Sequence, residues 1–244
     1  MKRIAIFVEG QSEIIFLRKL IPLILGYDKI SYKCLKLQAN KFSEIPYNYN
    51  TNVPTVDFNF LLINVQNDDL VLSAIKAREV NLFNRGYELI LGIRDMYCKS
   101  YNDKSKGKID DCVSELVKLR VHLETSKMSK PDKIFIHFSI MEFEAWILSM
   151  HTLFNKIDSA LSCESIRLKL GLDLKKIDPQ NEFYRPSNEL KRILKLCEID
   201  YDKSFSILER IFSRLAINDL DYVLTNNRCS SYIDFINCIK NHCN

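Results

Sequence analysis

Residues 3–20 read RIAIFVEGQSEIIFLRKL, and this stretch decides the fold expected for the N-terminal part of the chain. The apolar run Ile4–Val8 has the length and composition of a strand buried on both faces. It ends abruptly at Glu9-Gly10. A carboxylate carried into a core without a partner costs on the order of several kcal/mol. We therefore expect the strand to stop at Glu9 and to present its carboxylate at the edge of a sheet.

Short apolar runs alternate with helical patterns through the first 155 residues. Strands are predicted at Arg3–Val8, Ser31–Leu37, Phe60–Val65, Glu88–Arg94 and Lys133–Phe138. Helices are predicted from a Ser12 cap to Leu25 before Gly26, from Asp68 and Asp69 to about Asn84, and along the apolar positions Ile109, Val113, Leu116, Val117 and Leu123. This alternation predicts an α/β fold, with a mostly parallel sheet flanked by helices in the Rossmann-like manner.

The strand signal stops after Phe138, and only helical patterns follow. They cover Ser139–Phe154, Glu164–Leu170, Asn188–Cys197, Asp202–Leu215 and Ser231–Cys243. We therefore divide the chain into an α/β domain at 1–155 and a helical C-terminal region at 156–244 that packs on it. Ala39–Asp57 and the polar segment Lys99–Lys108 carry no periodic pattern and are expected to be irregular.

The composition describes an ordinary globular chain of 244 residues with a net charge of +4. That mild charge permits a nucleic-acid partner without indicating one. The eight cysteines form no C-x-x-C pair, which favours reduced thiols in a cytosolic protein over a disulfide framework or a zinc site. The apolar stretch from Ile14 to Leu25 contains Arg18, Lys19 and Pro22, so we expect no membrane span and a cytoplasmic protein.

Three carboxylates are placed at or just after predicted strand ends: Glu9, Asp95 in ELILGIRDMY (88–97), and Glu144. Ligands of open parallel sheets bind beyond the carboxyl ends of the strands. If the three strands are neighbours, the carboxylates would repel one another unless a hard cation such as Mg²⁺ or Mn²⁺ joined them. The alternatives are structural: Glu9 accepting from the backbone of the next helix, and Asp95 capping a turn or pairing with Arg94.

Glu142 has a stronger structural interpretation than Glu144. The spacing of Ser139 and Glu142 is that of a capping box, so Glu142 is expected to fold back on Ser139. Glu142 and Glu144 also lie about 200° apart around a helix, so one helix cannot direct both at one ion. Trp146, in the same apolar helix, is expected in the core. His137 and His151 have no partner at i+4 that would suggest a metal site.

The motifs resemble those of TOPRIM domains. FVEGQSEIIFLRKL (7–20) is similar to their opening motif, in which an apolar strand ends in Glu-Gly and a helix follows, and Asp95 matches the position of their acidic motif. IMEFEAWIL (140–148), RPSNELKRIL (185–194), IDYDKSFSILERI (199–211) and CSSYIDFINCI (229–239) resemble segments of an uncharacterised bacterial TOPRIM-like family. That family is often encoded beside ATPases in defence loci and is related to the nuclease domain of overcoming-lysogenization-defect proteins.

The resemblance implies a nuclease-type acid cluster that uses Mg²⁺ or Mn²⁺. Glu9 would serve in acid–base chemistry or hold a metal through water, while Asp95 and Glu144 would be metal ligands. Lys203 matches a basic family position and would oppose charge on phosphate oxygens, or else pair with Asp200 or Asp202. The family places a second acid where this chain has Tyr97, a poor Mg²⁺ ligand at neutral pH.

Two functions follow from these observations. The first is a metal-dependent nuclease, a hydrolase acting on DNA or RNA as an effector of antiphage defence. The second is a catalytically impaired TOPRIM-like subunit that binds an ATPase partner, favoured by Tyr97 and the modest charge. Asp68 and Asp69 either supply the missing charge or cap their helix. The lysines of the polar segment either line a nucleic-acid groove or are solvated: Lys99, Lys104, Lys106 and Lys108.

Overall fold

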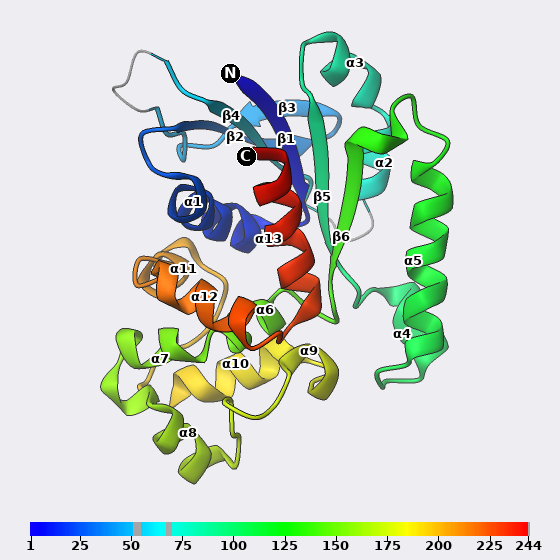
Figure 1. Cartoon of the computed structure of the whole chain (residues 1–244). Coiled ribbons are helices and arrows are strands. Elements are labelled where there is room, and N and C mark those ends of the chain that lie inside the picture. Colours follow the sequence, from blue (N-terminus) through cyan, green and yellow to red (C-terminus); the bar gives the residue numbers. More distant parts are fainter. Residues whose placement is uncertain (51–54, 67–69, 244) are drawn as a thin grey trace.

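The computed structural model describes residues 1–50, 55–66 and 70–243. A six-stranded sheet with the order β3-β2-β4-β1-β5-β6 forms its centre (Figure 1). The strands are β1 (Lys2–Val8), β2 (Ile30–Gln38), β3 (Lys41–Glu44), β4 (Phe58–Asn64), β5 (Leu89–Asp95) and β6 (Ile134–Ser139). β3 pairs antiparallel with β2, and the other neighbouring pairs are parallel. The predicted α/β fold is confirmed.

All five predicted strands are present, and β3 is the one that the sequence did not predict. It lies inside Ala39–Asp57, and all four of its residues are exposed. A strand without a buried face has no apolar alternation to reveal it.

Helices flank the sheet on both faces (Figure 1). The connections between strands contain α1 (Gln11–Leu25), α2 (Val71–Lys76), α3 (Glu79–Asn84), α4 (Lys99–Ser105) and α5 (Asp111–Thr125). The C-terminal region contains α6 (Glu144–Ser149), α7 (His151–Ile157), α8 (Cys163–Leu170), α9 (Pro179–Glu182), α10 (Pro186–Lys195), α11 (Phe205–Phe212), α12 (Ile217–Thr225) and α13 (Ser230–Cys243).

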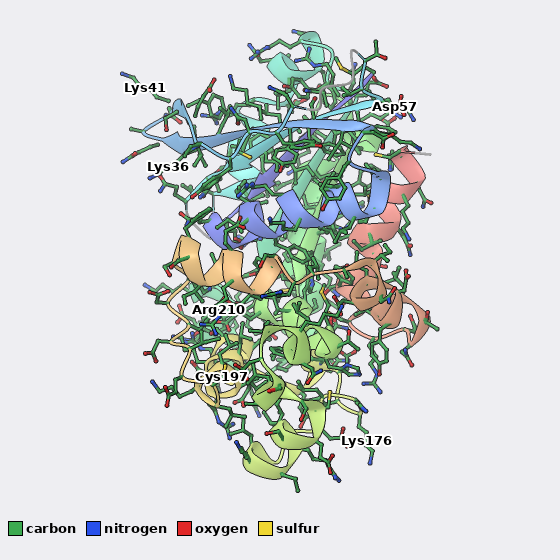
Figure 2. The ribbon with its side chains drawn as sticks, turned by 90° about the vertical axis from the view of Figure 1, so that its left-hand side faces the viewer. Lys36, Lys41, Asp57, Lys176, Cys197 and Arg210 are labelled. Carbon is green, nitrogen blue, oxygen red and sulfur yellow. The ribbon has the colours of Figure 1, made fainter. Side chains whose placement is uncertain are left out.

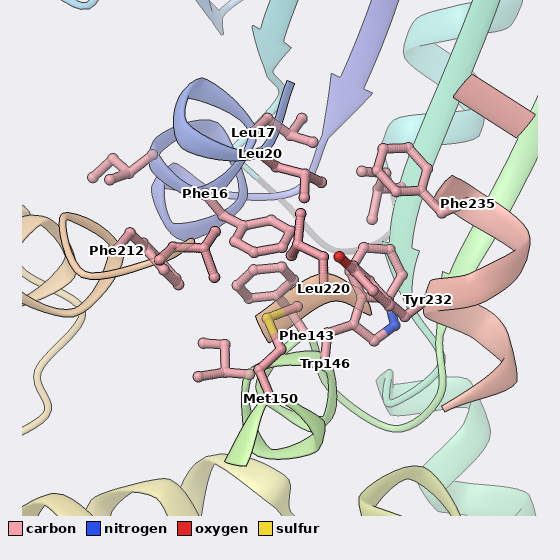
Figure 3. Close-up of a cluster of buried hydrophobic side chains, with 14 of the residues drawn as sticks. Phe16, Leu17, Leu20, Phe143, Trp146, Met150, Phe212, Leu220, Tyr232 and Phe235 are labelled. Atoms are coloured by element: carbon pink, nitrogen blue, oxygen red, sulfur yellow. The ribbon is translucent and has the colours of Figure 1, made fainter. Parts of the chain in front are cut away.

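The helical region and the sheet share one hydrophobic core. A single cluster of buried side chains runs from Ile4 on β1 through α1 to Cys243 at the end of α13. At its centre, Phe16 of α1 lies 5.1 Å from the ring of Phe143 and 5.3 Å from that of Phe212 (Figure 3). The C-terminal helices therefore pack on the face of the sheet that α1 covers.

Trp146 belongs to this core, which confirms its predicted place. It is fully buried and its ring stacks on Phe235, with centroids 5.4 Å apart. Its indole Nε1 donates to Ser231 Oγ at 2.9 Å. This hydrogen bond satisfies a polar group that would otherwise be costly to bury.

Three predicted helix starts are wrong. α1 begins at Gln11 with Gly10 as its N-cap, so Ser12 is a buried helical residue and not the cap. The helix predicted from Ser139 begins at Glu144, because β6 continues to Ser139 and Met141 has a left-handed φ of 62°. The helix predicted from Asp202 begins at Phe205, after Lys203 at φ 59°.

The middle segments also differ in detail from the prediction. The helix predicted to end near Asn84 is two helices, α2 and α3, and its predicted caps Asp68 and Asp69 lie outside the described residues. Lys99–Ser105, expected to be irregular, forms α4. The next helix, α5, buries Val113 and Val121. The sequence also predicted Leu116 and Leu123 on its apolar face, but the leucines of this helix are more than half exposed.

Gly92 lets α2 approach β5 closely. A Cβ at this position would lie 2.7 Å from Ile136 Cδ1 and 2.9 Å from Val71 Cγ1. We expect Gly92→Ala to lower the free energy of unfolding by about 1–3 kcal/mol, because the added methyl overpacks the core. Urea denaturation measures this. Adding Ile136→Val, which removes the clashing methyl, should recover part of the loss; an unchanged midpoint for Gly92→Ala would refute the explanation.

Candidate acidic site at the carboxyl ends of the strands

The strands that carry Glu9 and Asp95 are direct neighbours. β1 pairs with β5 so that Val8 lies opposite Ile93, and β5 pairs with β6 so that Asp95 lies opposite Ser139. The predicted site required these strands to be neighbours, and in the structure they are. The carboxyl ends of β1, β5 and β6 therefore form one edge, next to the helices of the C-terminal region (Figure 1).

The chain leaves β1 and β5 in opposite directions. After β1 it enters α1, which packs in the large cluster on one face of the sheet. After β5 it enters α4 and α5, which pack through Tyr101 and Val113 against Phe138 in a separate cluster. Adjacent parallel strands whose connections diverge in this way leave a crevice between their ends, the usual place for a ligand in open α/β sheets.

A cavity of about 480 Å³ occupies this crevice, and we call it the acidic cavity. Its volume lies within the range typical of small-molecule sites. Lys36, near the carboxyl end of β2 and labelled in Figure 2, also lines it. Its charged lining residues are Glu9, Glu13, Asp95, Lys36 and Lys203, and its uncharged polar ones are Gln11, Ser12, Asn64 and Gln66.

Glu13 is a site residue that the sequence analysis missed. It lies in the first turn of α1 and its side chain is buried, with an exposed fraction of 6%. A Cβ on Gly10 would lie only 3.1 Å from Glu13 Oε2, so the glycine makes room for this carboxylate. An acid in the first turn of a helix is usually explained by the helix dipole, so the sequence gives no separate reason to place Glu13 in a site. Its spacing of four residues from Glu9 was the available signal.

Asp95 lies among other carboxylates. Burial raises its pKa well above the usual range, and the charges of Glu13 and Glu144 add to the shift, while Lys203 opposes it. Among the described residues, Asp95 Oδ1 has no hydrogen-bond partner. Neither structural alternative for Asp95, a turn cap or a pair with Arg94, therefore provides this oxygen with a hydrogen bond.

Glu144 is the first residue of α6 and is fully buried. Its Oε1 accepts a hydrogen bond from Tyr201 at 2.9 Å and an ion pair from Lys203 Nζ at 2.8 Å. Burial and then the Glu144 charge raise the pKa of Tyr201 well above its usual value, so the phenol stays a donor. The other oxygen, Glu144 Oε2, has no hydrogen-bond partner within the described part of the chain.

Lys203 reaches the site instead of its local partners. Asp200 pairs with Lys195 at 2.8 Å and Asp202 accepts from the backbone of Ser204, so neither predicted alternative for Lys203 is realised. Burial alone would lower the pKa of Lys203, but Glu144, with smaller contributions from other site carboxylates, outweighs it and raises the pKa. The lysine is therefore a fixed positive charge between Glu144 and the cavity that it lines.

The donors fit a hard cation in chemistry and burial. Carboxylate oxygens are the ligands that Mg²⁺ and Mn²⁺ prefer, and Asp95 Oδ1 and Glu144 Oε2 are buried oxygens without hydrogen-bond partners in the described chain. Across residues 1–50, 55–66 and 70–243, however, no group of three or more His, Cys, Asp or Glu side chains already forms a metal site. One carboxylate oxygen of Glu144 is already bound to Lys203.

The capping-box prediction for Glu142 is wrong. Its Oε2 accepts from the backbone N–H of Ser187 at 2.8 Å, in the first turn of α10, and Arg185 lies 3.7 Å from its Oε1. The turn at Met141 separates Ser139 from the next helix, so the local pattern has no helix start on which to act. Glu142 therefore caps a different helix, and its exclusion from the acidic cavity stands.

Tyr97, at the position where the TOPRIM-like resemblance would place a second acid, is held by other contacts. The Arg185 guanidinium lies 3.8 Å from the centroid of its ring, and the ring of Tyr184 meets it edge-on at 5.4 Å. Tyr97 thus joins the end of β5 to the helical region. Asp68 and Asp69, the other residues considered as a source of the missing negative charge, lie outside the described residues.

Comparisons with protein-family models, with curated proteins and with solved structures find no match to this chain. In the part of the chain that the structure describes, no helix combines the length and apolar character needed to cross a bilayer. The argument for function therefore comes from the acidic cavity itself.

His137 provides a pH-dependent property separate from the cavity. Its ring meets Phe235 edge-on at 5.3 Å, and burial lowers its pKa to about 4. The unfolded chain binds a proton at this histidine below about pH 6.5, while the folded protein does not until about pH 4. The free energy of unfolding should therefore fall by up to about 3 kcal/mol over this interval.

His137→Phe should remove that contribution. Urea denaturation at pH 7, 6, 5 and 4 should show a smaller loss of stability in the variant than in the wild type. His122→Phe is the matched control, because it makes the same substitution at an exposed position on α5. Parallel pH curves for His137→Phe and wild type would contradict the prediction.

Proposed function

We propose that the protein is a nuclease of the TOPRIM type that uses Mg²⁺ or Mn²⁺ to cleave nucleic-acid phosphodiesters in the acidic cavity. One observation carries the proposal: carboxylates just after β1, in the first turn of α1 and at the end of β5 line a single crevice at the point where the strand connections diverge. Glu9 and Asp95 would hold the cation, with Glu144 Oε2 as a further donor. When bound, the cation would activate water and stabilise charge on phosphate oxygens.

The chain's own residues would supply the remaining chemistry. Lys203 has three N–H donors and uses one on Glu144, which leaves donors for a phosphate oxygen in the cavity that it lines. Lys36, on the opposite side of the cavity from the β5 end, offers a second positive charge to the nucleic-acid backbone. Glu9 at the end of β1 would hold the cation through the attacking water and accept the proton of that water.

The test is cleavage by the EDTA-treated protein after addition of Mn²⁺ or Mg²⁺. We expect labelled double-stranded DNA, single-stranded DNA or RNA to be cut with the cation and to stay intact in EDTA. Intact substrates of all three kinds under Mn²⁺, with protein that remains folded, would defeat the proposal. The family resemblance extends it to an effector role in antiphage defence beside an ATPase partner in the cytoplasm.

A second candidate is a TOPRIM-like subunit that binds an ATPase without cleaving nucleic acid. It is favoured by the Lys203–Glu144 ion pair, which already compensates the buried charge of a predicted metal ligand, and by the packing of Tyr97 under Arg185. This candidate predicts no Mn²⁺ binding by isothermal titration calorimetry and no cleavage. Mn²⁺ binding that is lost in Asp95→Asn would decide for the nuclease.

A further inference from the structure

A second cavity lies on the opposite face of the sheet, away from the acidic cavity. Its volume is about 540 Å³, and none of its described lining residues is shared with the acidic cavity. It is bounded by β1, β2, β3 and β4 and by the segment from Ala77 to Tyr87, which includes α3. Arg3 and Asn59 line it near the amino ends of β1 and β4, the end that Asp57 marks in Figure 2, and Phe42 lines it opposite Leu37, near the carboxyl end of β2. We call it the basic cavity.

The charged side chains that line the basic cavity are all positive. They are Arg3, Lys33, Arg78 and Arg85, and no Asp or Glu occurs among its described lining residues. Lys33 forms an ion pair with Glu44 of β3, while the three arginines contribute guanidinium groups. Guanidinium groups bind phosphate in a planar, bidentate manner, which makes this lining suited to a phosphate-bearing ligand.

Two of these arginines are already held in place. The Arg3 guanidinium lies 4.4 Å from the centroid of the Tyr87 ring, and its Nη1 donates to the Arg85 carbonyl at 2.5 Å. Arg78 lies 5.3 Å from the centroid of Phe42, and its Nη1 donates to the Ala74 carbonyl at 3.3 Å. Each guanidinium has five N–H donors, so these contacts fix it and leave donors for an anion. Such preorganisation reduces the entropy lost on binding.

The rest of the lining is apolar, aromatic or amide. Leu61 and Leu82 are buried, and each is less than a tenth exposed. Asn59, whose amide nitrogen donates to Ser31 Oγ at 2.8 Å, contributes an amide group, as do two further asparagines. A bare phosphate would use none of this surface. A heteroaromatic ring would use both the apolar floor and the amides.

We propose that the basic cavity binds a nucleoside phosphate, with the phosphates on the arginine side chains of its lining and the base against the apolar floor and the asparagine amides. The volume suits one such molecule. This site is independent of the acidic cavity and of the nuclease proposal.

Isothermal titration calorimetry of the full chain with ATP in EDTA tests the proposal. We expect one bound ATP per chain and a loss of affinity of about 10–100-fold in Arg78→Gln, since a charge-assisted hydrogen bond to phosphate is removed. Asn81→Asp, which adds a negative charge at the exposed rim, should weaken binding as well. Lys176→Gln is the matched control, because that lysine is 83% exposed and remote from the cavity.

Three results would overturn the proposal: no ATP binding, inorganic phosphate binding as tightly as ATP, or a single-stranded oligonucleotide binding more tightly than ATP through Arg78. The last result would identify a nucleic-acid surface instead. Asp95→Asn should bind ATP as the wild type does. If Asp95→Asn loses cleavage and still binds ATP, the ATP-site proposal is tested independently of the nuclease proposal.

Discussion

Asp95→Asn is expected to cut nucleic acid roughly 10²–10³ times more slowly than the wild type while unfolding at a higher temperature. The asparagine keeps the size of the side chain and removes its charge. In the wild type, burial and the carboxylates of Glu13 and Glu144 oppose that charge. Without a cation, the substitution should therefore add about 1 kcal/mol to the free energy of unfolding.

This opposite movement of activity and stability is what distinguishes a site residue from a structural one. Cleavage rates are measured with Mn²⁺ on labelled substrate, and thermal unfolding is followed in EDTA. Glu115→Gln on α5 is the matched control, because its carboxylate is 71% exposed and should affect neither property. If Asp95→Asn cuts at the wild-type rate, Asp95 has no place in the reaction. If it loses both activity and stability, Asp95 serves the fold.

The central strands could be predicted because burial on both faces leaves a continuous apolar run in the sequence. Ile4–Val8 and Leu89–Ile93 are such runs, and both lie in the middle of the sheet. β3 could not be predicted in this way, since its residues are exposed and its pairing with β2 is set by the turn at Ala39 and Asn40, both at positive φ.

Helix starts were predicted less well because tertiary contacts replace local caps. Ser139 and Glu142 have the spacing of a capping box, yet Glu142 caps α10 through Ser187, 45 residues further along the chain. Ser12 has the right chemistry for an N-cap, but the chain must turn from β1 into α1 directly at Gly10. The local sequence pattern does not predict a capping partner that is distant along the chain.

The candidate site divides in the same way. Glu9 and Asp95 could be placed because strand ends are visible in the sequence and parallel strands share an edge. The partners of Glu144 could not be predicted. Tyr201 is 57 residues away in the sequence, and Lys203 pairs with Glu144 although two aspartates are nearer to it along the chain. Glu13 was overlooked because its position in the first helical turn already has a sufficient local explanation.

Lys203→Met is expected to lower the free energy of unfolding by about 3 kcal/mol, near the low end for a broken buried ion pair because about half of Lys203 is exposed. Within the described part of the chain, the substitution leaves the fully buried Glu144 carboxylate with the Tyr201 hydroxyl as its remaining hydrogen-bond donor. Methionine at φ 59° is no more strained than lysine, so the backbone contributes nothing to the difference.

The double variant with Glu144→Gln isolates the charge. A glutamine still accepts from Tyr201 and carries no charge to compensate, so Lys203→Met with Glu144→Gln should regain most of the loss, to within about 1 kcal/mol of wild type. Lys195→Met is the matched control, because its partner Asp200 is 81% exposed and such surface pairs contribute less than about 1 kcal/mol. Urea denaturation of the wild type, Lys203→Met, Glu144→Gln and the double variant gives the coupling energy. A Lys203→Met variant no less stable than Lys195→Met would mean that Glu144 does not depend on this lysine for its buried charge, and Lys203 would then be free to act on phosphate alone.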